Sequence, residues 1–159
     1  MAILEPDSAP PDDDLLRAQE TQLGAILAES GSVLVAYSGG VDSTYLAWMA
    51  HRTLGARAVA ATLLSPLNPP GEAAAATETA RLIGVRHETV AFAPLELEAF
   101  RVNPPDRCYH CKRALMERLQ QLARDLGLAV VADGENVDDA ADWRPGRRAT
   151  AELGIRHPL

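Results

Sequence analysis

A short polar loop at residues 38–43, Ser-Gly-Gly-Val-Asp-Ser, carries the residue types best suited to chemistry in this chain. It follows the apolar run 33–37 and precedes a segment with helical spacing, which predicts a buried strand, a tight turn and a helix start. The free N–H groups of such a start, with the hydroxyls of Ser43 and Thr44, suit a phosphate-sized anion. We expect Gly39 and Gly40 to permit positive φ and close approach of a ligand to the backbone.

The loop lacks the lysine of a Walker loop, because no segment fits GxxxxGK followed by Ser or Thr. It carries a carboxylate instead, Asp42, which would repel a polyphosphate unless a hard cation such as Mg²⁺ lay between them. The pattern therefore favours a nucleotide site with Ser38 and Ser43 as phosphate ligands. An ordinary Gly-Gly turn, with Asp42 as a plain helix cap, is the alternative.

The second candidate for chemistry is the pair Cys108 and Cys111, which are the two cysteines of the chain. Their C-x-x-C spacing allows a redox pair, half of a zinc site or partial ligation of an iron–sulfur cluster. Zinc would need further ligands, for which His110 and His87 are the candidates. We expect the cysteines in a loop whose basic residues favour thiolates, namely Arg107, Lys112 and Arg113.

The elements around these motifs alternate between strand and helix. Strands are predicted at 33–37, 57–64, 86–92 and 128–132, and helices at 15–30, 44–54, 72–83 and 115–126. The first helix is expected to bury one face, formed by Leu15, Leu16, Leu23, Ile26 and Leu27. This order implies parallel β–α units in a doubly wound α/β sheet.

Ligands of such sheets bind beyond the carboxyl ends of the strands. Ser38, Ser65 and Asp133 each follow a different predicted strand, so we expect all three to lie at that edge. Asp133 and Gly134 could contact nucleotide or metal there, although a cap or simple turn is the alternative.

Composition narrows the class of protein. The 159 residues are 47% hydrophobic, enough for one domain with a core at residues 15–159, after an acidic, proline-rich tail at 1–14. The net charge of −7 disfavours nucleic acid, and no stretch approaches the ~20 apolar residues of a membrane span. The tail does not fit a signal peptide, so a cytoplasmic location is expected.

Several motifs resemble one family. The loop at 38–43 is similar to the SGGxDS loop of the PP-loop ATP pyrophosphatase superfamily. Residues 103–112 (NPPDRCYHCK) resemble the N-P-x-x-R-C-Y-x-C-K segment of its ATP-dependent sacrificial sulfur transferases, the LarE family. Residues 133–139 (DGENVDD), 142–146 (DWRPG) and 152–159 (ELGIRHPL) also match that family, with His157 in place of a serine.

The resemblance implies an adenine nucleotide α-hydrolase-like, Rossmann-like PP-loop domain with strand order 3-2-1-4-5. It implies an enzyme of nickel-pincer cofactor biosynthesis that uses ATP and Mg²⁺ to adenylate a carboxylate of a pyridinium biscarboxylate mononucleotide. A sulfur nucleophile then displaces AMP and leaves a thiocarboxylate. The expected partner is thus a small-molecule substrate, neither nucleic acid nor membrane, and a homo-oligomer is expected.

The C-x-x-C segment matches the family subgroup in which three cysteines bind a 4Fe–4S cluster with an exchangeable sulfide. Cys108 and Cys111 would then be two of its ligands, and the third would lie beyond Leu159, where the family continues and this chain ends. We therefore expect a chain shortened at its C-terminus, with plausible ATP binding and incomplete sulfur transfer.

The resulting site prediction has two parts. Asp42, Cys108 and Cys111 are the candidate catalytic residues, with Asp42 for Mg²⁺ and the cysteines for the cluster. ATP is expected at Ser38, Gly39, Gly40, Asp42, Ser43 and Gly134. The alternatives are another adenylating PP-loop enzyme, either an NAD, GMP or asparagine synthase type or a tRNA thiolase, and an ATP-binding remnant without full activity.

Overall fold

The computed structural model describes residues 13–136 and 146–159. The first twelve residues of the predicted tail lie outside the described residues. So do residues 137–145, with Asp138, Asp139, Asp142, Trp143 and Arg144 of the two motifs that resemble the sulfur transferases. The first helix, α1 (Asp13–Glu29), begins two residues inside the segment that we expected to be a tail.

A four-stranded sheet forms the centre of the fold. It contains β1 (Val33–Ala36), β2 (Ala58–Leu64), β3 (Arg86–Ala91) and β4 (Val130–Asp133). The order is β3-β2-β1-β4 and every pairing is parallel, as the alternation of strands and helices predicted. In the place of a fifth strand there is a single parallel bridge between Ala132 and Arg156. The Arg156 N–H donates to the Val131 carbonyl at 2.9 Å, and its carbonyl accepts from the Asp133 N–H at 3.0 Å.

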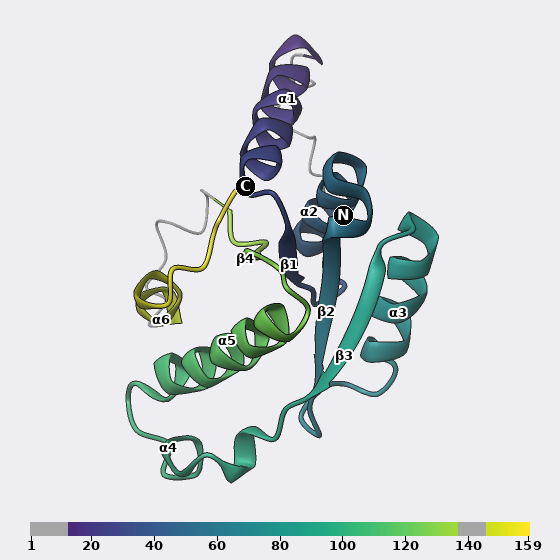
Figure 1. Ribbon diagram of the computed structural model, residues 1–159. Helices are drawn as coiled ribbons and strands as arrows, with labels where there is room; N and C mark the ends of the chain where they lie inside the picture. Colours follow the sequence, from purple (N-terminus) through teal and green to yellow (C-terminus); the bar gives the residue numbers. More distant parts are fainter. Residues whose placement is uncertain (1–12, 137–145) are drawn as a thin grey trace, which may run out of the picture.

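Helices cover both faces of the sheet (Figure 1). The principal helices after α1 are α2 (Val41–Leu54), α3 (Glu72–Ile83), α5 (Arg107–Asp125) and α6 (Gly146–Glu152). Short turns at η1 (Gly55–Arg57), η2 (Pro94–Glu96) and α4 (Glu98–Arg101) connect them. None of the helices within the described ranges is long and apolar enough to cross a membrane.

The core consists of two layers, one on each side of the sheet. Val33 and Val35 of β1 face a cluster with α1, α2 and α3, whereas Leu34 between them faces α5. This alternation is the two-residue period of a strand, and it explains why β1 is apolar at every position. Met116 and Leu119 of α5 pack in the second layer.

Helix α1 buries less of its predicted face than expected. Leu23 and Leu27 are buried, but Leu15 is 57% exposed, Leu16 42% and Ile26 39%. Leu16 shares the face of Leu23 but lies two turns earlier, where α1 extends past the sheet (Figure 1). Helical spacing predicts which face of a helix can be buried. How many residues of that face are buried depends on how far the sheet extends beneath the helix.

Helix α5 begins at Arg107, whereas the sequence predicted its start near Leu115. Cys108 and Cys111 therefore lie in the first turns of a helix and not in a loop as we predicted. The leucine pattern marks only the part of α5 that packs in the core, because none of residues 107–114 is buried or belongs to the second core layer.

Candidate functional site

The polar loop at residues 38–43 joins β1 to α2, and its two glycines have different roles. Gly39 has φ +84°, and a Cβ there would lie 3.0 Å from the Ala76 Cβ of α3, so glycine is needed for conformation and for space. Gly40 has φ −70°, which corrects our expectation of positive φ. A Cβ on Gly40 would instead lie 3.3 Å from the Ser38 Oγ.

The two serines of the loop are hydrogen-bonded to each other across it. The Oγ atoms of Ser38 and Ser43 are 3.1 Å apart, and the buried Ser43 hydroxyl donates to the Gly40 carbonyl at 3.1 Å. The Thr44 hydroxyl donates to the Tyr37 hydroxyl at 3.3 Å, and Thr44 lies outside the cavity that Ser38 and Ser43 line. Ser43 shapes the loop, and the exposed Ser38 is the hydroxyl open to a ligand.

Gly134 brings the end of β4 against the first turn of α2. A Cβ on Gly134 would lie 2.8 Å from the Ser43 backbone nitrogen and 3.0 Å from the Asp42 carbonyl carbon. Such distances leave no room for a side chain. Because Gly134 has no side chain, the end of β4 can lie in direct contact with the amino terminus of α2.

A cavity of about 580 Å³ opens at the carboxyl edge of the sheet. Its walls come from the loop after β1, the loop after β2, the segment after β3, one face of α5 and residues 133–135. Ser38, Ser65 and Asp133 all line it, as predicted for three loops that follow parallel strands. Of the other predicted site residues, Gly40, Asp42, Ser43, Gly134 and Cys111 line the cavity, whereas Gly39 and Cys108 do not.

The two cysteines have different environments. Cys108 is exposed and Cys111 is half-buried against the cavity, and both are free thiols. Burial raises the pKa of the Cys111 thiol, the charge of Cys108 raises it further, and Arg107 only partly opposes them. For Cys111 this reverses our expectation that the basic neighbours would favour the thiolate.

The residues present supply two of the three cysteine ligands that such a cluster needs. Within the described ranges, neither cysteine belongs to a group of three or more side chains that could hold a metal ion. His110 pairs instead with Asp106 at 3.1 Å, and the His87 ring lies 2.8 Å from the Thr62 hydroxyl on the sheet. A four-ligand zinc site that uses these histidines is therefore not formed.

Asp133, at the end of β4, is the most buried charged group of the cavity, with 6% of its side chain exposed. Its carboxylate accepts from the Lys112 ammonium at 3.0 Å and contacts His157 Nδ1 at 2.6 Å. Its neighbour Glu135 forms an ion pair with Arg147. Asp133, Glu135 and His157 together could hold a metal ion by spacing, but both carboxylates already have a cationic partner.

The cavity fits a nucleotide that arrives with Mg²⁺. Four carboxylates line it (Asp42, Glu72, Asp133 and Glu135), against one ammonium group, Lys112. Asp133 and Glu135 are already ion-paired, so Asp42 and Glu72 carry the negative charge that would repel a bare polyphosphate and offer the oxygen ligands that Mg²⁺ prefers. Asp42 is exposed at the first turn of α2, and its carboxylate accepts from the Asn136 amide at 3.3 Å.

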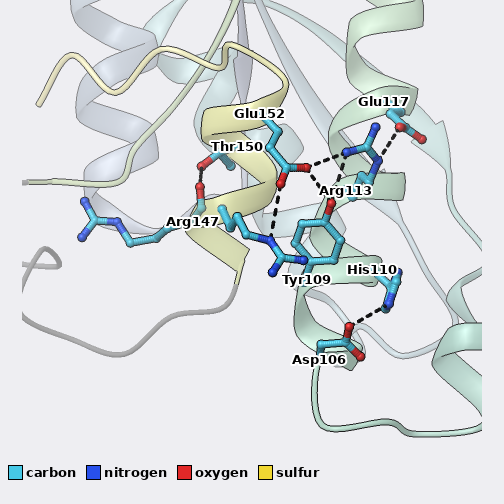
Figure 2. Close-up of polar contacts among 9 residues, drawn as sticks. Asp106, Tyr109, His110, Arg113, Glu117, Arg147, Thr150 and Glu152 are labelled. Carbon is cyan, nitrogen blue, oxygen red and sulfur yellow. Dashed lines mark hydrogen bonds and ion pairs between the residues drawn. The ribbon is translucent and has the colours of Figure 1, made fainter.

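A polar network fixes α6 to the start of α5, the turn that carries the cysteines (Figure 2). The Glu152 carboxylate accepts from the Tyr109 hydroxyl at 2.6 Å and from Arg113 at 2.9 Å. The Arg148 guanidinium lies 4.0 Å from the Tyr109 ring centroid, and its Nε is 3.4 Å from Glu152. Arg148 thus has partners within this network.

Sequence reasoning missed several residues of the cavity. Glu72, Glu135 and Lys112 lie there, as do the aromatic rings of Phe92 and Phe100. Lys112 had a signal, since it follows Cys111 directly and is the single lysine of the chain. The phenylalanines had none, because Phe92 ends a predicted strand and Phe100 lies in a segment for which no element was predicted.

Comparisons with known proteins agree with this geometry. The family model described as asparagine synthase matches residues 22–126. An uncharacterized protein from Synechocystis sp. is 43% identical over 91% of this chain and 54% of its own length. The pyridinium-3,5-bisthiocarboxylic acid mononucleotide synthase of Lactiplantibacillus plantarum is 34% identical over 91% of this chain and 52% of its own. The chain thus spans about half the length of these curated relatives.

Among solved structures, the glutamine-dependent NAD+ synthetase of Acinetobacter baumannii, in complex with ADP, has the same fold. It superposes with a TM-score of 0.67 at 20% identity, over 85% of this chain and 28% of that one. The α/β PP-loop fold predicted from the strand, loop and helix pattern is therefore confirmed.

Proposed function

The chain belongs to the asparagine synthase family of PP-loop proteins, and from this premise we propose that it is the ATP-binding part of an adenylating sulfur transferase. The resemblance to sulfur transferases is supported by the 34% identity with the mononucleotide synthase of L. plantarum. We propose the corresponding substrate, a pyridinium biscarboxylate mononucleotide, and the corresponding product, its thiocarboxylate.

The proposed reaction has two steps. In the first, a carboxylate oxygen of the substrate attacks the α-phosphorus of ATP, the bond to the β-phosphate breaks, and pyrophosphate leaves. In the second, hydrosulfide attacks the carbonyl carbon of the acyl adenylate, AMP leaves with the electron pair of the broken C–O bond, and the thiocarboxylate forms directly. If a cysteine thiolate attacks instead, the product is a thioester, and loss of the cysteine Cα proton with cleavage of its Cβ–S bond then releases the thiocarboxylate and leaves dehydroalanine. The protein's contribution to the first step is to hold the attacking oxygen and the phosphorus in line.

The observation that carries the proposal is a single cavity that contains both motifs. Ser38, Gly40 and Ser43 of the loop after β1 line the same cavity as Cys111 of α5. A nucleotide with its phosphates on that loop would have its activated carboxyl group in a space that a thiol also borders. An enzyme that delivers ammonia has no need of a cysteine there, so this arrangement favours sulfur over amide transfer.

In this proposal the loop residues bind the phosphates. Free N–H groups at the start of α2, with the Ser38 hydroxyl, would face the anion, and Gly39, Gly40 and Gly134 permit the close packing that shapes the loop. Asp42 would hold Mg²⁺, which when bound offsets the repulsion between the carboxylates and the phosphates. The side chain of Asp42 is exposed at the cavity and so is available as an oxygen ligand.

Cys111 is proposed as the residue that presents sulfur to the acyl adenylate, with Cys108 as its partner one helical turn away. The raised pKa of Cys111 keeps it largely a thiol at neutral pH, so a positive group near it, or deprotonation by the reaction, is needed for attack. No step is assigned to an iron–sulfur cluster, since the two thiols of this chain do not complete one.

The experiment that tests the proposal is exchange of labelled pyrophosphate into ATP. Exchange should appear with Mg²⁺, ATP and pyridinium-3,5-biscarboxylic acid mononucleotide together, and not when any of these is left out. Nicotinic acid mononucleotide, which has one carboxylate, and aspartate with ammonium are the matched controls. The proposal fails if the chain binds ATP but supports no exchange with the biscarboxylate, or if exchange follows aspartate instead.

A further inference from the structure

Lys112 stands out in the composition of the chain. Fifteen residues are lysine or arginine, and Lys112 is the single lysine among them. Arginine is suited to bidentate pairing and surface ion pairs, whereas lysine offers a compact charge with three donors that rotate freely.

The structure places this lysine in the nucleotide cavity. Lys112 lines the cavity from α5, directly after Cys111, with about one third of its side chain exposed (33%). Its ammonium group lies 3.0 Å from the buried Asp133 carboxylate. Among the residues that line the cavity within the described ranges, it is the one cationic side chain, and four carboxylates line the same space.

Both ends of the Lys112 side chain are held in place. A Cβ on Gly146 would lie 3.3 Å from both the Cβ and the Cγ of Lys112, so α6 begins directly against the aliphatic part. At the other end, Asp133 is itself held by the Glu135 N–H at 3.3 Å and by His157 at 2.6 Å. A side chain confined at stem and head loses little conformational entropy when it binds a ligand.

The position relative to the phosphate loop follows from Gly134. Asp133 holds the ammonium, and the next residue packs its backbone against the Ser43 nitrogen in the first turn of α2. The positive end of α2 and the Lys112 ammonium therefore border the same space from different elements.

We propose that Lys112 binds the phosphate chain of the nucleotide and so supplies from α5 the cation that the loop after β1 lacks. With three donors, the ammonium can keep its bond to Asp133 and donate another to a phosphoryl oxygen. Asp133 and His157 act as positioning residues. The inference rests on the proposed function, because it requires that ATP binds in this cavity.

The test uses the fact that Lys112 is the only lysine amine. Acetylation by an N-hydroxysuccinimide ester, followed by mass spectrometry of peptides, reports on Lys112, and the terminal α-amine serves as internal reference. Saturating Mg²⁺–ATP is expected to slow acetylation of Lys112 about tenfold, and adenosine should give no protection. Calorimetry in the same buffer establishes that Mg²⁺–ATP is bound.

A pair of variants gives an independent measurement. Lys112→Met should raise the Kd for Mg²⁺–ATP about tenfold, the loss expected for one hydrogen bond to a charged group. Arg118→Met removes one charge from an exposed position of the same helix and should leave the Kd unchanged.

These measurements distinguish failure of the proposed function from failure of the inference about Lys112. If wild type binds no Mg²⁺–ATP, the proposed function fails and this inference fails with it. If wild type binds Mg²⁺–ATP but acetylation of Lys112 is not slowed, or adenosine protects equally, only the inference is overturned. The same holds if Lys112→Met folds and binds Mg²⁺–ATP as tightly as Arg118→Met.

Discussion

Replacing Gly134 with alanine should damage stability and nucleotide binding together. The new Cβ would lie 2.8 Å from the Ser43 nitrogen and 3.0 Å from the Asp42 carbonyl carbon, both backbone atoms that cannot rotate away. Because Gly134 does not have positive φ, the whole effect is steric. Relief requires that the end of β4 and the first turn of α2 move apart by several tenths of an ångström.

The expected size follows from overpacking, which costs about 1–3 kcal/mol when backbone must shift. For a domain of this length each kcal/mol lowers the melting temperature by about 2–4 °C. Urea unfolding gives the free energy, and calorimetry with Mg²⁺–ATP gives the affinity, which should also fall because the displaced turn carries the Ser43 N–H.

Gly24→Ala is the matched control, since Gly24 lies inside α1 with its nearest neighbour, the Thr53 Oγ1, at 3.9 Å from a new Cβ. Alanine in a helix interior should stabilise by up to about 1 kcal/mol, so the two substitutions are expected to have opposite signs. The reasoning is refuted if Gly134→Ala unfolds at the same urea concentration as wild type and binds Mg²⁺–ATP equally well.

Three further outcomes are expected. Glu152→Ala should destabilise the chain by about 1 kcal/mol in urea unfolding, because the Tyr109 hydroxyl loses its charged acceptor, while Glu78→Ala on the exposed face of α3 should cause no measurable change. Cys108→Ser should lower the pKa of Cys111, because the charge of Cys108 is one of the two causes that raise it. The rate of iodoacetamide alkylation of Cys111, measured against pH, should then rise at lower pH than in wild type. An unchanged pH profile would contradict the coupling between the two cysteines. Chelation of Mg²⁺ with EDTA should abolish ATP binding in calorimetry, because four carboxylates line the cavity, and undiminished binding would show that Lys112 and the loop suffice.

Elements with strong local signals were predicted closely. Helix α3 has the predicted bounds of residues 72–83, because a proline-rich loop precedes it and Gly84 follows with φ +80°. The strands agree to within a residue or two, since each is an apolar run between turn residues. The start of α5 was missed because its first two turns are charged, and their helix is supported by contacts with α6 through Glu152 and Gly146.

The sequence alone determined the loop after β1 and its partner strands. The loop at residues 38–43 contains two glycines and a carboxylate between serines, and it directly follows one apolar strand. Its conformation therefore depends mainly on local backbone sterics and on burial of that strand. The parallel sheet then places the ends of β1, β2 and β4 at one edge, which is why the order of strands and loops was enough to group Ser38, Ser65 and Asp133.

Only the tertiary structure decided which side chains of residues 107–113 enter the cavity. At about 100° per residue, Cys108, Cys111 and Lys112 lie on one face of α5, so position along the helix and not rotation leaves Cys108, one turn earlier, outside the cavity. The position of α5 on the sheet is set by the packing of Met116 and Leu119 in the core. The sequence therefore identified a phosphate loop and a cysteine pair, and packing determined that one cysteine and the single lysine meet the loop in one site.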